Sequence, residues 1–395
     1  MAQTLVINGN HAAAYGAKLS KVQFISAYPI TPQTVIVERL AQMVENGELN
    51  AKFIRVESEH SALAACIGAA SAGLRTFTAT SSHGLAYMHE MIIWAAGARL
   101  PIVMPVVTRA FAPPWSIWDE HTDILLERDT GWIVFMAENN QEVFDTIIQA
   151  YRIAENENVL LPVMIGMDAF ILSHTTTPVE IPDQELVDDF LTQESKRPFI
   201  LDPNNPITHG SLTYPEWYME FRYLLYKAMI DAKSVIKDTA NQWTKLTGKY
   251  HGDLIDCYKC TDADVNIITI GSPSGDAKEA ADILRSEGYR TGVIRLRVIR
   301  PFPSEELRQV AYNSKVLIVV DRNLSPGIGG ILLNEVKAAF QTMKKQPLIH
   351  GFIAGLGGRD ITLQNFISMF KRGYEILEKG EEPGIEWINL RKEVL

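Results

Sequence analysis

The chain has 395 residues, of which 47% are hydrophobic and 21% charged, and its formal net charge is −10 at pH 7. This length and composition are ordinary for a globular protein with a large core and two or three domains. Acidic and basic residues are interspersed, so neither nucleic acid nor a membrane surface is expected as the main partner. The start "MAQTLVINGNHAAAYG" lacks a signal-peptide pattern and no run reaches the roughly 18 apolar residues of a membrane span, which predicts a cytoplasmic protein.

Strands and helices are predicted to alternate along the first half of the chain. Short apolar runs predict strands at 22–25, 53–56, 76–79, 101–107 and 159–166. Apolar residues at helical spacing predict helices at 35–43, 61–72, 88–96 and 140–154. The near-continuous apolar run "PIVMPVV" is typical of a parallel strand covered on both faces, so the expected fold is a doubly wound parallel α/β sheet.

The stretch 178–208 is rich in Pro, Asp and Glu and is expected to be a surface connector, followed by a long amphipathic helix at 214–246. A second α/β unit follows, and the expected domains are 1–255 and 256–395. Its strands are expected at 265–272, 291–303, 315–323 and 347–358, with a helix at 276–287 that closes at Gly288. The sequence "GSPSG" at 271–275 matches no phosphate-binding motif, which favours an ordinary turn.

The chain has three cysteines, Cys66, Cys257 and Cys260. So small and odd a number argues against a disulfide framework. Cys257 and Cys260 form a C-x-x-C, but structural zinc sites and [4Fe–4S] clusters need four ligands, and Cys66 lies in a helix expected to be buried. The pair is therefore interpreted as structurally incidental rather than as a redox or metal site.

The turn Tyr28-Pro29-Ile30-Thr31-Pro32 separates a predicted strand from a predicted helix. Proline fixes φ at two positions, which holds the Thr31 hydroxyl in a stiff loop near backbone N–H groups, an arrangement that suits an anion. The alternative is a proline-bounded helix start with Thr31 as its cap.

Polar side chains follow two further strands. Glu57, Glu59 and His60 lie between a strand and an Ala-rich helix, where they are either acidic residues facing a helix dipole or ligand-binding groups. His83 and Gly84 follow the strand in "TFTATSSHGLAYMHEM", and ligands bind at such strand ends in open α/β sheets. A hydroxyl-rich helix cap explains this second segment except for His83.

Arg109 follows the central apolar strand and precedes a proline-stiffened aromatic loop, "RAFAPPWSIWDEHTD". A guanidinium offers paired N–H donors that match the two oxygens of a carboxylate, so this loop is a candidate for holding a carboxylate in an apolar pocket. Alternatively, Arg109 pairs with Asp119, Glu120 or Asp123 in its own loop.

Many segments in order resemble the alpha subunit of the 2-oxoacid:ferredoxin oxidoreductases, which oxidise pyruvate or 2-oxoisovalerate with thiamine diphosphate. The resemblance rests on "YPITPQ", "VESEHSA", "RTFTATSSHGLAYMHEM", "RAFAPPWSIWDEHTD", "EIPDQELVDDFL" and "RPFP", and it spans nearly the whole chain. It implies a pyrimidine-type thiamine diphosphate-binding domain plus a second α/β domain like the transketolase C-terminal domain.

The resemblance also implies roles for individual residues. Thr31 and Arg109 would bind the carboxylate of the 2-oxo acid, with Phe111 lining the substrate site. Glu59 would hydrogen-bond N1′ of the cofactor's pyrimidine and promote its imino tautomer. Pro29, Ile30, His83 and Gly84 would contact the cofactor. The cofactor itself supplies the electron sink for decarboxylation.

The Gly-Asp-Gly segment with which thiamine enzymes hold the diphosphate through a metal ion does not occur in this chain. The resemblance therefore implies a beta subunit that holds the diphosphate and Mg²⁺. It also implies gamma and ferredoxin-like delta subunits with [4Fe–4S] clusters, CoA as co-substrate and ferredoxin as acceptor. Alone, the chain is expected to be inactive.

Departures from the family qualify this transfer. Family members often carry Gln in place of His83, so a proton-transfer role for His83 is a hypothesis. The loop 110–115 is more like that of the 2-oxoisovalerate enzymes, while an aryl glyoxylate remains an alternative substrate. Relatives that use oxalate carry Arg in place of Thr31, so a dianionic substrate is not expected. The other open alternatives are a non-catalytic docking subunit and a transketolase-like transferase.

Overall fold

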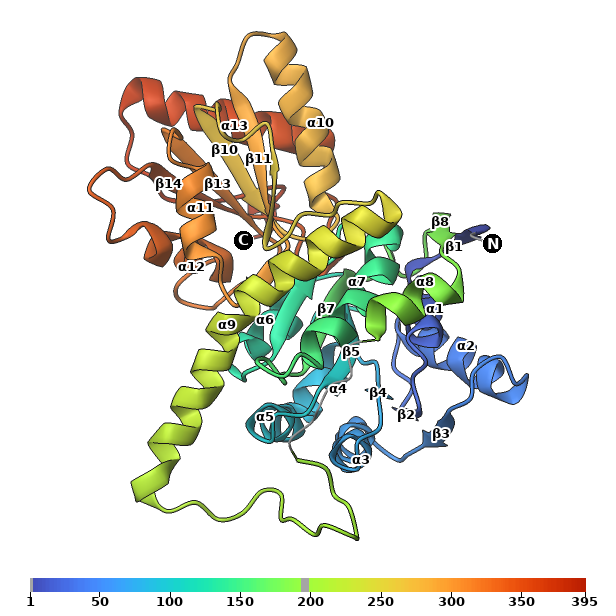
Figure 1. The fold of residues 1–395 in the computed structure, drawn as a ribbon. Coiled ribbons are helices and arrows are strands. Elements are labelled where there is room, and N and C mark those ends of the chain that lie inside the picture. Colours follow the sequence, from blue (N-terminus) through green and yellow to red (C-terminus); the bar gives the residue numbers. More distant parts are fainter. Residues whose placement is uncertain (1–2, 193–198) are drawn as a thin grey trace.

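The computed structural model describes residues 3–192 and 199–395, which form two large sheets with helices on their faces (Figure 1). The strands of the first sheet are β2 (Phe24–Ala27), β3 (Lys52–Arg55), β4 (Thr76–Phe77), β5 (Ile102–Thr108), β6 (Ile133–Met136), β7 (Val163–Asp168) and β12 (Val298–Arg300). Their order is β12-β6-β7-β5-β4-β2-β3, and all neighbours are parallel except β12 with β6. The α/β architecture predicted from the sequence is confirmed.

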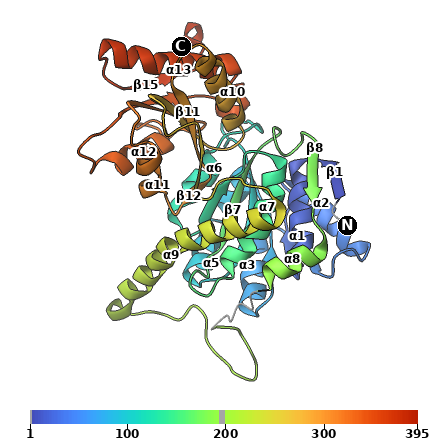
Figure 2. The ribbon, with the colours of Figure 1, turned by 45° about the horizontal axis from the view of Figure 1, so that its top comes forward.

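Helices cover both faces of this sheet. They are α1 (Gly9–Leu19), α2 (Thr34–Glu45), α3 (Glu59–Ser71), α4 (Ser82–Tyr87), α5 (His89–Gly97), α6 (Thr122–Leu126), α7 (Asn140–Ala154), α8 (Gln184–Leu191) and α9 (Pro215–Thr247). Helices α1, α2, α7 and part of α9 share one hydrophobic core, while α3, α4 and α5 belong to a second. Helix α9 crosses the molecule beside α7, and its first turns project beyond the body (Figure 2). No helix of the described chain is long and apolar enough to cross a membrane.

The second sheet lies beside the first and is built from the last third of the chain. Its strands are β9 (Ile255–Tyr258), β10 (Val265–Thr269), β11 (Thr291–Leu296), β13 (Val316–Asp321), β14 (Leu348–Ile353) and β15 (Ile385–Trp387). Its helices are α10 (Pro273–Ser286), α11 (Ser304–Val310), α12 (Ile331–Phe340) and α13 (Leu363–Lys379). The order is β15-β14-β13-β10-β11-β9, with β9 antiparallel at the edge. Short 3₁₀ turns occupy Glu127–Asp129, Leu356–Gly358 and Lys392–Val394.

Three sequence predictions are corrected by this fold. The predicted strand at 291–303 is two strands, because β11 stays in the second sheet while β12 crosses to pair with β6 of the first. The predicted connector at 178–208 contains α8 and most of β8 (Thr177–Ile181), which pairs with β1 (Gln3–Ile7). Its residues 193–198 lie outside the described residues. The predicted strand at 76–79 is only two residues long, and α4 follows it.

The cysteine prediction is also corrected, because Cys257 and Cys260 form a disulfide. Their turn places the two Cα atoms 5.4 Å apart, within the range that a disulfide can bridge. The cysteine count gave no hint of this, since a bridge between near neighbours needs no framework of other disulfides. Cys66 is fully buried in α3, as expected.

A buried network of ion pairs links the two sheets. Glu142 of α7 lies 2.9 Å from Nη1 of Arg295, on β11, and 2.8 Å from Nε of Arg297, which directly follows β11. All three side chains are only 1% exposed. Burial by itself would raise the pKa of Glu142, but the two guanidiniums outweigh it and lower the pKa to about 2.

Glu142→Gln is expected to destabilise the chain by about 3 kcal/mol, because it removes the carboxylate that two buried guanidiniums share, and in the described chain only Arg295 keeps another carboxylate, Glu138, at 3.3 Å. The lowered pKa makes this contribution complete above about pH 4.5 and lost as the pH falls toward 2. Urea unfolding of the purified chain should therefore show a difference between the two proteins that shrinks at acidic pH. Glu45→Gln, at an exposed position of α2, is the matched control and should change little. An equal effect of both substitutions would contradict this role.

Candidate active site at four neighbouring strand ends

The strands β3, β2, β4 and β5 are adjacent and parallel, so their carboxyl ends meet at one edge of the first sheet. The segment that follows each strand carries one of the predicted site residues. Thr31 follows β2, Glu59 follows β3, His83 follows β4 and Arg109 follows β5. Ligands bind at such an edge in open α/β sheets.

The Arg109 guanidinium joins the segments after β5 and β2. Its Nη1 donates a hydrogen bond of 2.7 Å to the carbonyl of Thr31, and Trp115 lies 5.9 Å away on one side. Arg109 is 4% exposed, and within the described chain its Nε has no partner. Burial lowers the pKa of this side chain. Since its guanidinium forms no hydrogen bond to Asp119, Glu120 or Asp123 in the described residues, it retains N–H capacity for an anion.

Thr31 lies in an exposed loop that also contains the predicted cofactor contacts Pro29 and Ile30. The helix α2 begins at Thr34 with Gln33 as its N-cap residue, so the alternative in which Thr31 caps the helix is wrong. The Gln33 side chain donates to the carbonyl of Tyr28 at 2.9 Å and closes the turn on itself. The Thr31 hydroxyl is therefore presented to solvent beside Arg109.

Glu59 is the first residue of α3 and is only 8% exposed. Within the described residues, no hydrogen bond or ion pair to its carboxylate is found. The carboxylate lies against Gly84, where an added Cβ would come within 2.6 Å of Glu59 Oε1 and 2.6 Å of Thr80 Oγ1. The Thr80 hydroxyl is itself buried without a partner in this part of the structure. Because the Glu59 carboxylate has no donor in the described chain and its oxygens still reach solvent, it is free to accept a hydrogen bond from a ligand.

The other polar residues of that segment face elsewhere. Glu57 bonds to the Ser61 hydroxyl at the surface, and His60 lies 3.3 Å from the exposed Glu90. Ser58 caps α3 by accepting from the Ser61 N–H at 3.2 Å. Each of the two interpretations of this cluster therefore holds for some of its residues. Glu57 and His60 lie at the surface of a helix start, whereas Glu59 alone points inward as a ligand-binding group would.

His83 has both ring nitrogens engaged by the protein. Its Nε2 accepts the Ala112 N–H at 3.0 Å, and its Nδ1 lies 3.2 Å from Ser82 Oγ, whose hydroxyl donates to Ala110 O. This network assigns a neutral ring with the proton on Nδ1. The ring also packs edge-on against Phe111, at 5.3 Å between centroids. His83 thus holds the loop that follows Arg109.

His83→Gln is expected to keep kcat/KM of the assembled complex within about fivefold and to leave the pH profile unchanged, because a Gln amide oxygen can also accept the Ala112 N–H. His83→Ala, which leaves that partly buried N–H without its acceptor, should lose about tenfold or more. Steady-state rates between pH 6 and 9 provide the measurement. If the rate of the unmodified complex falls at one end of this pH range and the fall is absent in His83→Gln, the result would instead support proton transfer by His83.

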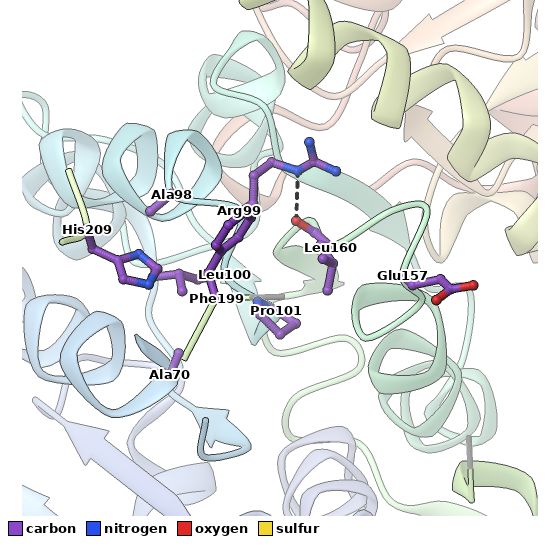
Figure 3. Close-up of a pocket in the computed structure, with 9 residues that line it drawn as sticks. All are labelled: Ala70, Ala98, Arg99, Leu100, Pro101, Glu157, Leu160, Phe199 and His209. Carbon is purple, nitrogen blue, oxygen red and sulfur yellow. Dashed lines mark hydrogen bonds between the residues drawn. The ribbon is translucent and has the colours of Figure 1, made fainter. Parts of the chain in front are cut away.

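One cavity lies between the loop that follows Arg109 and the loops of the second sheet, and of the predicted site residues only Phe111 lines it. Its volume is about 620 Å³, and it is lined by Phe111 and Pro114 from the loop after Arg109 and by Leu324 and Leu356 from the second unit. A smaller cavity of about 200 Å³ lies elsewhere, near Arg99 (Figure 3). There Arg99 donates to the carbonyls of Val159 and Leu160, and no predicted site residue lines that cavity.

The comparisons with known proteins agree with this geometry. Residues 15–241 match the family model described as pyruvate flavodoxin/ferredoxin oxidoreductase, thiamine diP-binding, and residues 263–366 match pyruvate:ferredoxin oxidoreductase core domain II. The chain is 49% identical over 391 residues to pyruvate synthase subunit PorA of Pyrococcus abyssi, covering 99% of both chains. It is 48% identical over 388 residues to ketoisovalerate oxidoreductase subunit VorA of Pyrococcus horikoshii, covering 98% of both.

The chain belongs to the pyruvate flavodoxin/ferredoxin oxidoreductase family. It corresponds to the alpha subunit and works within a multi-subunit complex, so the resemblance seen in the sequence is confirmed. A solved 2-oxoglutarate:ferredoxin oxidoreductase from Magnetococcus marinus shares the fold, with a TM-score of 0.69 at 21% identity. That similarity covers 94% of this chain and 65% of the other.

Residues 15–241, which match the thiamine diphosphate-binding family model, include all four strand-end segments. The residues present fit the pyrimidine end of that cofactor, because the Glu59 carboxylate has no donor in the described chain and Gly84, which has no side chain, lets Glu59 and Thr80 pack against its backbone. The turn at Gly271 does not provide a phosphate loop. Its next residue, Ser272, donates its N–H to Asp168 at 3.0 Å, which makes that segment an inter-domain contact.

Asp123, which the sequence suggested only as a possible partner of the Arg109 side chain, instead binds two backbone N–H groups beside the candidate site. It is 1% exposed, and its Oδ2 accepts the N–H groups of Ser82 at 2.9 Å and Arg109 at 3.0 Å. It thereby ties the segment after β4 to the segment after β5. Burial raises the pKa of Asp123 to about 7.

A second group of buried polar side chains links the loop after Arg109 to the second sheet. Asp119 accepts from the Thr108 hydroxyl at 2.6 Å and pairs with Arg322, which extends from the end of β13. His121 Nε2 lies 3.0 Å from Asp168 Oδ1. The side-chain atoms of Asp119, His121 and Asp168 that could bind a metal ion lie within 4.8 Å of one another. Arg322 provides positive charge to both carboxylates, so the cluster joins the two units just behind Arg109.

Proposed function

We propose that this chain is the alpha subunit of a thiamine diphosphate-dependent 2-oxoacid:ferredoxin oxidoreductase. In the assembled complex it takes part in oxidative decarboxylation of a monocarboxylic 2-oxo acid, pyruvate or 2-oxoisovalerate, with CoA. The products are acyl-CoA, CO₂ and reduced ferredoxin. The observation that carries this proposal is the buried Glu59 carboxylate with no hydrogen bond in the described chain.

Each site residue has a role that follows from its surroundings. Glu59 accepts a hydrogen bond from the cofactor's pyrimidine ring, and Gly84 makes room for the Glu59 side chain itself. Arg109, aligned by Thr31 O, offers its free N–H groups to the substrate carboxylate, and the Thr31 hydroxyl donates beside it. Phe111 provides an apolar wall, and Pro29 and Ile30 border the cofactor. When bound, the cofactor supplies an electron sink for decarboxylation.

The diphosphate end is assigned to another polypeptide, because this sequence contains no Gly-Asp-Gly segment. The proposed partners are a beta subunit that holds the diphosphate and Mg²⁺ and gamma and ferredoxin-like delta subunits that carry [4Fe–4S] clusters. Residues 1–255 then form the cofactor-binding domain and 256–395 the second domain. Mixing separately purified subunits tests this division: the chain alone should not oxidise 2-oxo acids, and activity on its own would overturn the proposal.

The neutral Thr31 beside Arg109, at a position where relatives that use oxalate carry arginine, predicts selectivity for substrates with one carboxylate. The value of kcat/KM for pyruvate or 2-oxoisovalerate should exceed that for 2-oxoglutarate by about 100-fold, because a second buried carboxylate would lack a partner. An aryl glyoxylate, included in the same series, probes the size of the pocket beside Phe111. Equal use of 2-oxoglutarate would contradict this assignment.

A non-catalytic docking subunit is the alternative that the site disfavours. Such a subunit has no use for an inward carboxylate that is 8% exposed and lacks a donor in the described structure. The effect of Glu59→Gln on turnover separates the two functions.

A further inference from the structure

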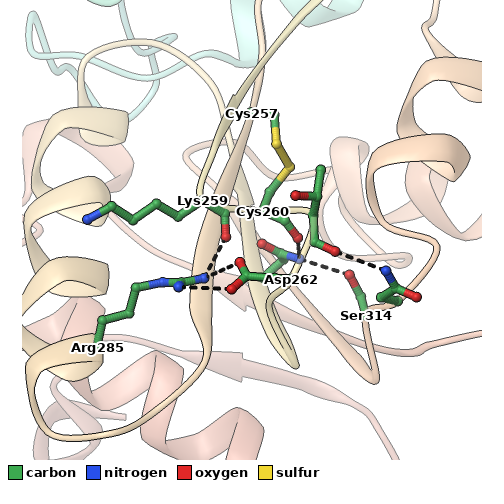
Figure 4. Close-up of a disulfide and its surroundings, with 9 residues drawn as sticks. Cys257, Lys259, Cys260, Asp262, Arg285 and Ser314 are labelled. Atoms are coloured by element: carbon green, nitrogen blue, oxygen red, sulfur yellow. Dashed lines mark hydrogen bonds and ion pairs between the residues drawn. A yellow bond between two sulfur atoms is a disulfide. The ribbon is translucent and has the colours of Figure 1, made fainter.

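The disulfide between Cys257 and Cys260 lies outside the site described above. It follows β9, the antiparallel edge strand of the second sheet (Figure 4). The two sulfurs close a C-x-x-C turn in which Lys259 has a positive φ of 50°. A left-handed conformation at a lysine costs free energy, so the surrounding structure must hold this turn.

Hydrogen bonds fix the turn independently of the sulfur–sulfur bond. The carbonyl of Cys260 accepts from Asn266 Nδ2 at 2.9 Å, and the carbonyl of Lys259 accepts from Arg285 Nη2 at 2.8 Å. Arg285 is itself paired with Asp262 at 2.6 Å (Figure 4). The Lys259 ammonium is paired with Asp282 at 2.6 Å. Because these contacts do not involve sulfur, the two thiols of the reduced turn would stay close together.

The two sulfur-bearing residues differ in accessibility. Cys260 is 1% exposed, whereas Cys257 is partly exposed on the edge strand. Thiol–disulfide exchange needs an approach path to the attacked sulfur, and of the two residues only Cys257 keeps exposed surface, although it packs against the core on one side. Strand β9 is the last strand in the sheet order, so no strand of the described chain pairs with its outer edge.

We propose that Cys257 and Cys260 form a reversible thiol–disulfide redox site whose reaction partner is a dithiol, either a small molecule or a protein. A thiolate of the dithiol attacks Cys257 Sγ, the bond between Cys257 and Cys260 breaks, and Cys260 leaves as a thiolate that takes up a proton. The second thiol of the partner then displaces Cys257, which is protonated in turn. Two electrons and two protons pass to the chain, and the dithiol becomes a disulfide.

The test uses the assembled complex, purified without thiols. It is equilibrated with mixtures of reduced and oxidised dithiothreitol, alkylated under native conditions, and digested for mass spectrometry of each cysteine peptide. Cys257 and Cys260 should become alkylated together along a two-electron curve and become protected again on reoxidation. Cys66 is the internal control: burial raises the pKa of its thiol to about 12, so it should react only after unfolding.

A rate measurement distinguishes the two sulfurs without any substitution. In the reduced native complex, alkylation of Cys257 should be about tenfold faster than that of Cys260. In matched variants, Cys260→Ser should form a mixed disulfide with an added aromatic disulfide reagent faster than Cys257→Ser does. The proposal is overturned if no mixture of reduced and oxidised dithiothreitol reduces the disulfide before the protein unfolds. It is also overturned if the two thiols do not form a disulfide on reoxidation, or if Cys260 is alkylated as fast as Cys257.

Discussion

Glu59→Gln in the assembled complex is expected to lower turnover by about 10²–10⁴-fold, the range associated with a lost acid–base interaction. The amide is nearly the same size as the carboxylate, so the packing against Gly84 is retained while the negative charge is lost. Subunit assembly and the melting temperature of the complex should stay unchanged. The measurement is the rate of ferredoxin reduction at saturating 2-oxo acid, CoA and thiamine diphosphate.

Glu57→Gln is the matched control for this substitution. Glu57 lies two residues earlier, bonds to the Ser61 hydroxyl at the surface and carries the same charge. Its replacement should leave turnover within about twofold, since surface substitutions rarely affect more than local contacts. Turnover that is unchanged in Glu59→Gln would support the docking-subunit alternative and contradict the catalytic assignment.

Arg109→Lys is expected to lower kcat/KM for the 2-oxo acid by about 10²-fold or more, mainly through a raised KM. One guanidinium nitrogen already donates to Thr31 O, and the remaining N–H groups are available for a carboxylate. A lysine ammonium is a point charge that cannot reproduce this planar set of donors. The affinity for thiamine diphosphate should change much less than the KM for substrate.

Arg99→Lys provides the control for Arg109→Lys. Arg99 is also a partly buried arginine that donates to backbone carbonyls, but it borders the separate cavity near Val159 and Leu160. Its replacement should leave the KM for the 2-oxo acid unchanged even if stability falls. A similar rise of KM in both variants would show that the Arg109 effect is structural.

The sequence predicted most of the parallel sheet because the fold uses simple patterns. The run at β5 is apolar throughout and is buried throughout, and the helix predicted at 140–154 coincides with α7. The expected helix end at Gly288 is also present, with a φ of 95°. In these elements local propensity and tertiary burial agree.

The errors fall where a segment's partner is distant in sequence. The transfer of β12 to the first sheet depends on β6, more than 150 residues earlier by the register of Val298 with Phe135. In β8 only every second residue is buried, and its pairing with β1 decides its structure. No local pattern identifies such a strand among the surrounding prolines and acids.

The site was partly predictable for a similar reason. Thr31, Glu59 and Arg109 follow apolar strands, and the rule that ligands bind at strand ends brings them together. The supporting residues were not predictable, because Asp123 acts through backbone N–H groups of two loops and Arg322 arrives from the second sheet. The neutral, loop-holding state of His83 likewise depends on Ala112 and Ser82, which only the fold brings into contact.

The central claim is that this chain supplies the carboxylate for the aminopyrimidine end of a coenzyme shared with another subunit. It is tested most directly by an experimental structure of the assembled complex with thiamine diphosphate bound. The account predicts a Glu59 oxygen at about 3 Å from N1′ of the ring, with the diphosphate and its metal ion held by the partner chain. A ring placed away from Glu59, or a carboxylate from another polypeptide at N1′, would contradict it.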